Sequence, residues 1–146
     1  MSSGLRELRV WQESVALAGD VIRAVRQGMR RETKTIGDSI MATGVAVAVH
    51  IADGYARTTP PEQRDSYLAA RRALVRLETE LAIAKQADLL PAGAFTELTA
   101  RASQVAKMLG GYVVYLDRQL ADPGRALPPR PPERPALSPD SARAPS

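Results

Sequence analysis

The spacing of apolar residues predicts helices along most of the chain. In the first stretch they recur at steps of three and four, which aligns them on one side of a helix over residues 6–29. The members of this stripe are Leu8, Trp11, Val15, Ala18, Ile22, Val25 and Met29. The same spacing predicts helices over residues 60–88 and 92–121, with stripes that run from Tyr67 to Ala84 and from Leu98 to Leu116. Because Tyr67 lies on a stripe, we expect it to pack in the core.

Residues 35–57 are apolar on nearly every side. Val45, Val47, Val49 and Ile51 alternate as in a strand, but alanine fills most of the intervening positions and a lone strand has no partner. We therefore predict a helix here. A helix in a single-chain bundle keeps one face in solvent, so this amount of apolar surface favours cover by a second copy of the chain. The predicted oligomer interface consists of Gly44, Val45, Ala48, Val49, Ala52 and Ala56. The alternative is a helix buried inside one asymmetric bundle.

Helix boundaries are marked by capping residues and prolines. In Thr59-Pro60-Pro61-Glu62 a threonine precedes proline and a glutamate follows three residues later, as in a capping box. Leu90-Pro91 separates the next two helices, and Asp122-Pro123-Gly124 ends the last. Such short connections favour antiparallel neighbours. The predicted fold is all-α, an antiparallel up-down four-helix bundle over residues 1–121.

Residues 122–146 are rich in proline and poor in large apolar residues. Such a composition cannot bury enough surface to offset its ordering entropy. We predict a disordered Pro-rich tail. The run Pro128-Pro129-Arg130-Pro131-Pro132 could also dock a proline-reading module, although a solubilising tail is the simpler interpretation.

The overall composition narrows the classes of protein. There are 20 Lys+Arg against 16 Asp+Glu, a net charge of +4, one His and no Cys. Without cysteine there is no disulfide or thiol nucleophile. No unbroken apolar run reaches the roughly 18 to 20 residues of a membrane span. We expect a cytoplasmic protein without a membrane partner. The excess of basic over acidic residues permits an acidic partner.

Catalytic motifs find little support. A di-iron bundle needs Glu-x-x-His repeats, but His50, the one histidine, has Val47 three residues before it. No glycine-rich phosphate loop precedes a helix. We predict no enzyme activity, metal, cofactor or small-molecule substrate, and interpret His50 as a hydrogen-bonded core residue.

Positive charge gathers in two segments, which are the candidate nucleic-acid-binding residues. The first comprises Arg23, Arg26, Arg30, Arg31 and Lys34. The second comprises Arg64, Arg71, Arg72 and Arg76. Both could bind phosphates by releasing counterions. The first could equally be a solvated helix end whose arginines favour the negative pole of the helix dipole. Glu78 and Glu80 are expected to pair with arginines, within or between subunits.

Three segments carry a family resemblance. They are Leu8-Arg9-Val10-Trp11-Gln12, Ile51-Ala52-Asp53-Gly54-Tyr55-Ala56-Arg57 and Leu77-Glu78-Thr79-Glu80-Leu81-Ala82-Ile83-Ala84. Together they resemble the four-helix bundle proteins encoded in 23S rRNA intervening sequences. The same superfamily includes the accessory variability determinant of diversity-generating retroelements.

The resemblance implies a homopentamer that binds nucleic acid through a basic surface. Family members commonly carry an arginine pair, a proline and an asparagine where this chain has Met41, Ala42, Ala48 and His50. That departure weakens any transfer of nucleic-acid binding to the helix over 35–57. The predicted function is non-enzymatic binding of RNA, or DNA, by an oligomer. The alternative is an accessory scaffold that docks a reverse transcriptase and its RNA template.

Overall fold

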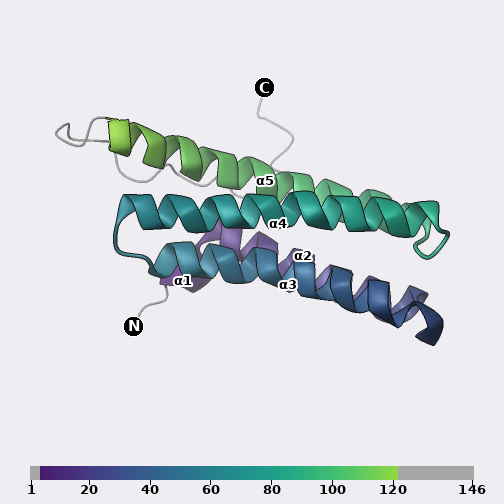
Figure 1. The fold of residues 1–146 in the computed structure, drawn as a ribbon. Helices are drawn as coiled ribbons and strands as arrows, with labels where there is room; N and C mark the ends of the chain where they lie inside the picture. The colour runs from purple at the N-terminus through teal and green to yellow at the C-terminus, as the bar shows by residue number, and fades with distance from the viewer. Residues whose placement is uncertain (1–3, 122–146) are drawn as a thin grey trace, which may run out of the picture.

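The computed structural model describes residues 4–121, which are helical apart from short connections (Figure 1). The elements are α1 (Gly4–Glu7), α2 (Arg9–Gly28), the 3-10 turn η1 (Arg31–Thr33), α3 (Lys34–Ala56), α4 (Pro60–Gln86) and α5 (Ala92–Ala121). No strand occurs in these described residues, so the all-α prediction is confirmed. The predicted tail, 122–146, and the stop signal Asp122-Pro123-Gly124 lie outside them.

The long helices α2, α3, α4 and α5 share one hydrophobic core. Helix α3 contacts α2 and α4, and α5 contacts the same two helices from the other side. Figure 1 shows α4 between α5 and α3, with α2 behind α3. Each long helix therefore has two helical neighbours and one side turned to solvent.

The apolar stripes predicted for α4 and α5 are confirmed as the core faces of these helices. In α4 the buried apolar residues are Tyr67, Ala70, Leu74, Leu77, Leu81 and Ala84. In α5 they include Leu98, Ala102, Val105, Leu109, Tyr112 and Leu116. The rings of Tyr67 and Tyr112 lie 5.7 Å apart between centroids. Tyr67 is 1% exposed and is therefore a packing residue, as predicted.

The stripe predicted for the first helix is partly wrong. The helix is interrupted at Leu8, whose backbone is extended and whose side chain is buried. Val15, a predicted core residue, is 43% exposed. The core row is instead Val10, Ser14, Leu17, Ala18, Val21 and Val25. Ser14 tolerates burial because its hydroxyl donates to the Trp11 carbonyl at 2.8 Å.

Helix α3 forms where the alternating valines had allowed a strand, so the helix prediction is confirmed. Its glycines are packing surfaces within the chain. A Cβ built on Gly37 would lie 3.0 Å from Val25, and one on Gly44 would lie 3.4 Å from Val21. Glycine at these positions lets α3 approach α2 closely.

Within residues 4–121, one segment, 31–56, is long and apolar enough to cross a membrane by length and composition alone, a property that core helices share.

The start of α4 uses the capping residues predicted from sequence. Thr59 is the N-cap, and its hydroxyl oxygen accepts from the Glu62 backbone N–H at 3.4 Å. The Glu62 carboxylate accepts a hydrogen bond from the Thr59 hydroxyl at 2.9 Å rather than reaching the Thr59 amide. Pro60 and Pro61 occupy the first helical turn, where a missing N–H costs no hydrogen bond.

Candidate nucleic-acid interface

The connection from α2 to α3 carries the denser group of positive charges. We call Arg23, Arg26, Arg30, Arg31 and Lys34 the basic end; all five are exposed. Two of them are neutralised locally, because Arg23 pairs with Asp20 and Lys34 pairs with Asp38, with Nζ 2.6 Å from the carboxylate oxygen. Asp20 also lies 2.9 Å from Arg101 of α5 and so joins α2 to α5.

The other three arginines of the basic end have no such partner in the described chain. No carboxylate of residues 4–121 lies within 4.0 Å of Arg26, Arg30 or Arg31. Exposed guanidinium groups without an internal counterion are suited to phosphate oxygens. The same exposure is compatible with arginines that favour the helix dipole, since Arg26 lies in the last turn of α2.

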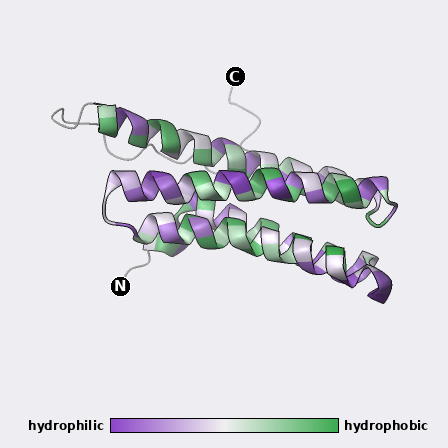
Figure 2. Cartoon of the chain, in the orientation of Figure 1, coloured by the Kyte–Doolittle hydropathy of each residue, from purple (hydrophilic) through white to green (hydrophobic). Residues whose placement is uncertain are grey.

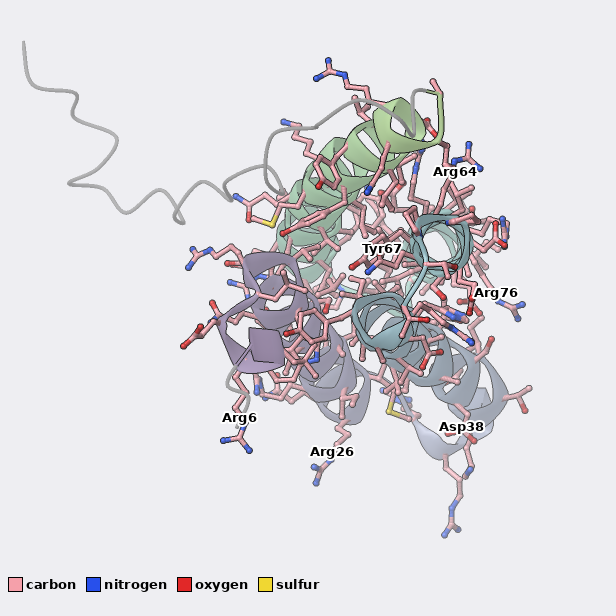
Figure 3. All side chains as sticks on the ribbon, turned by 90° about the vertical axis from the view of Figure 1, so that its left-hand side faces the viewer. Arg6, Arg26, Asp38, Arg64, Tyr67 and Arg76 are labelled. Carbon is pink, nitrogen blue, oxygen red and sulfur yellow. The ribbon has the colours of Figure 1, made fainter. Side chains whose placement is uncertain are left out.

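The arginines of α4 do not form a single group. Arg64 pairs with Asp117 of α5, whereas Arg72 and Arg76 line a groove shared with α3. Arg71 is exposed. The sequence places these four side chains near one another on one helix, but the two flanking helices divide them between different partners. In Figure 3, Arg26 and Arg76 project from different sides of the molecule, so one chain does not join them into one basic patch.

The α3/α4 groove is open to solvent and has a volume of about 540 Å³. Its lining residues are Ser39, Ala42, Thr43, Ala46 and His50 of α3, and Ala69, Arg72, Ala73 and Arg76 of α4. Alanines leave room between the two helices, and the arginines give the groove a positive side. His50 is half-buried at this surface rather than enclosed in the core, so its predicted core position is wrong.

Glu80 is a buried carboxylate beside this groove. It is 8% exposed and accepts a hydrogen bond from the Ser39 hydroxyl through Oε2. Its other oxygen, Oε1, lies 3.8 Å from the Nε of Arg76, too far for a hydrogen bond. The expected pairing of Glu80 with an arginine is thus present as a loose ion pair. Glu78 is exposed and has no arginine within 4.0 Å in residues 4–121.

Apolar residues on the outer side of α3 are exposed to solvent, and Figure 2 shows hydrophobic colouring along much of this helix. Val45 is 42% and Val49 is 50% exposed, and Ala56 is exposed. Ala48 and Ala52 are half-buried. Gly44 is wrong as an interface residue, because it is buried against α2 of its own chain. The row of small residues Gly44, Ala48, Ala52 and Ala56 therefore turns from the inside of the molecule to the outside along α3.

Within residues 4–121 no group of three or more His, Asp or Glu side chains is arranged to hold a metal ion. Gly110 and Gly111 lie within α5, and a Cβ built on either would meet nothing within 4 Å. In the described chain this pair therefore has no close neighbour beyond its own helix.

Over residues 4–121, these observations define an all-helical protein with surface arginines that have no internal counterion and with an exposed apolar helix face. The model of the family described as 23S rRNA-intervening sequence protein matches residues 6–111, more than half of the chain. The chain therefore belongs to this family. A search of curated proteins found no match. The family match extends from α1 to Gly111 and leaves the last turns of α5 outside it.

Proposed function

We propose that this protein is a non-enzymatic, self-associating four-helix bundle, antiparallel and up-down, that binds structured RNA through surface arginines. The observation that carries the proposal is the basic end, where Arg26, Arg30 and Arg31 have no carboxylate within 4.0 Å in residues 4–121. The family description, which refers to an intervening sequence of 23S rRNA, supports RNA as the acidic partner. Recognition would depend on charge and shape rather than on chemistry.

Self-association is supported by the outer face of α3. Val45 and Val49 leave about half of their surface in water, and Ala56, two helical turns beyond Val49, is also exposed. Burying apolar surface against a second copy would be favourable by roughly 25 cal/mol per Å². We propose a pentamer, the assembly that the family resemblance implies. An assembly would also bring arginines from several chains onto one composite surface.

The experiment is a salt titration of RNA binding, followed by fluorescence anisotropy with a labelled RNA hairpin. Neutralising the basic end by Arg26→Gln, Arg30→Gln and Arg31→Gln should flatten the slope of log affinity against log salt by about 0.7 to 0.9 for each phosphate that the variant no longer neutralises. The control neutralises three other exposed cations: Arg6, Lys107 and Arg118. If both triple variants behave alike, the basic end is not the RNA-binding surface. Binding that does not depend on salt would exclude the proposal.

A second candidate is a protein-docking scaffold, such as the accessory subunit of a reverse transcriptase. The same apolar face of α3 favours it, because that face could receive another protein instead of a second copy. Light scattering coupled to size-exclusion chromatography separates the two candidates. Self-association requires an oligomer at micromolar concentration, whereas a stable single subunit would leave this face open to another protein and favour the scaffold.

A further inference from the structure

We infer that the α3/α4 groove is a phosphate-binding site in which Arg72 and Arg76 hold the phosphate and Glu80 is the positioning residue for Arg76. The inference rests on the proposed function and deepens it, because it names a second contact surface and the chemistry that it recognises. The ligand class is a phosphate group, either of an RNA backbone or free in solution.

The two arginines are spaced to act together. Residues four apart on a helix have Cβ atoms about 5–6 Å from each other and face the same side. Both side chains line the groove, and both are exposed. No carboxylate of residues 4–121 lies within 4.0 Å of Arg72. The alanines between α3 and α4 leave space in which a phosphate can reach both guanidinium groups.

Glu80 approaches the guanidinium of Arg76 from its Nε side, not from the side of its two terminal nitrogens. The nearest atom of Arg76 to the carboxylate is Nε, while the side chain as a whole is 69% exposed. The two terminal nitrogens therefore remain available, and these nitrogens form the parallel hydrogen bonds of a bidentate phosphate contact. The hydrogen bond from Ser39 and the burial of Glu80 fix the carboxylate in place. Glu80, anchored to both α3 and α4, is thus placed to orient Arg76 through their ion pair.

A positioning role and simple electrostatics predict opposite effects on phosphate affinity when the Glu80 carboxylate is removed. A carboxylate near a phosphate repels it, so by Coulomb's law its removal should tighten phosphate binding. If Glu80 instead holds Arg76 in the binding orientation, its removal leaves a long side chain that must be ordered on binding, and affinity falls. The isosteric change Glu80→Gln removes the charge and keeps an oxygen that accepts from Ser39.

The test measures binding of the same RNA hairpin to the full chain and to four variants: Arg72→Gln, Arg76→Gln, Glu80→Gln and the double variant of Arg76 and Glu80. Each arginine variant should weaken binding about threefold to tenfold at low salt and flatten the salt slope by about 0.7. Glu80→Gln should weaken binding about twofold to fourfold in the native chain and have no effect when Arg76 is already replaced.

Unchanged or tighter binding by Glu80→Gln, or an effect that persists without Arg76, would overturn the positioning role. Far-ultraviolet circular dichroism and the unfolding midpoint check that each variant is folded. Ser39→Ala provides a second variant that keeps the charge of Glu80 and removes its anchor, and it should weaken binding in the same direction as Glu80→Gln.

Competition with inorganic phosphate distinguishes the two sources of the ligand. Displacement of RNA from the native chain, but not from the Arg72 variant, identifies a site that takes free phosphate. Failure to displace RNA assigns the site to backbone phosphates. If RNA binds through the basic end and the groove variants bind normally, only this inference fails. If neither the native chain nor any variant binds RNA, both this inference and the proposed function fail.

Discussion

Gly54 offers a direct test of how the core is packed. This residue belongs to the segment that carries the family resemblance, and it is buried at the end of α3. A Cβ at this position would lie 2.5 Å from Cε1, 2.8 Å from Cδ1 and 3.0 Å from Cζ of Tyr67. The Tyr67 ring is enclosed and packs against Tyr112, so it has little room to move. Glycine is therefore required here by the close approach of an aromatic ring.

The expected effect of Gly54→Ala follows from two opposing terms. Alanine favours a helix interior by about 1 kcal/mol over glycine. Overpacking a core costs about 1–3 kcal/mol, and separations below 3.0 Å place the cost at the upper end. We expect the free energy of unfolding to fall by about 2 kcal/mol. Gly110→Ala is the matched control: its Cβ meets nothing within 4 Å, so stability should rise by about 1 kcal/mol.

Urea unfolding followed by circular dichroism at one fixed protein concentration measures both variants. The concentration must be fixed because self-association shifts apparent stability. The opposite signs of the two substitutions are the essential result. A stability gain for Gly54→Ala equal to that of Gly110→Ala would show that Tyr67 does not pack over Gly54, and the arrangement of α3 against α4 would have to be revised.

The remaining predictions concern a helix cap, a strained residue and the apolar face. Thr59→Ala should lower the free energy of unfolding by about 1 kcal/mol because the α4 cap is removed, and an unchanged urea midpoint would contradict the capping assignment. Asp88 has a φ of 60° just after α4, so Asp88→Gly should raise the thermal midpoint by relieving up to about 1 kcal/mol of strain; a lower midpoint would argue against this backbone conformation. Changing Val45 and Val49 to lysine should reduce the assembled mass in light scattering, whereas Val75→Lys, at a more exposed valine of α4, should not. An unchanged mass for the double variant would exclude this face as the interface.

The sequence predicted the core faces of α4 and α5 because the row at steps of three and four is the longest apolar row in each, although Val75 and Val114 lie outside it in solvent. Helix α2 has two neighbouring apolar rows, one with Leu17 and Val21 in the core and one with Val15 in solvent. Periodicity of 3.6 residues cannot choose between adjacent rows, since both satisfy it. Packing against α3 selects the row that becomes the core, because Gly44 leaves room for Val21. Tertiary contact rather than local pattern fixed the rotation of this helix.

In the candidate sites, too, the local pattern predicted some features and tertiary contacts decided the others. That arginines such as Arg26 and Arg30 would be exposed could be predicted, because long charged side chains are rarely buried without a partner. The partners could not be predicted, since Arg64 pairs with Asp117 at a separation of 53 residues. The α3/α4 groove was likewise missed: its arginines were recognised, but Ser39 and Glu80 meet only after folding across 41 residues.

The glycines of α3 also limit how a second copy can bind. A small-residue ridge would let two helix backbones approach closely, but Gly37 and Gly44 are already in contact with α2, and Gly54 is covered by Tyr67. The outer face that remains carries the branched side chains of Val45 and Val49. Such residues protrude and interdigitate with a neighbour rather than admitting its backbone. An interface on α3 would therefore gain its stability from side-chain packing, which is why a charge at the valines is a more informative perturbation than a larger residue at Gly44.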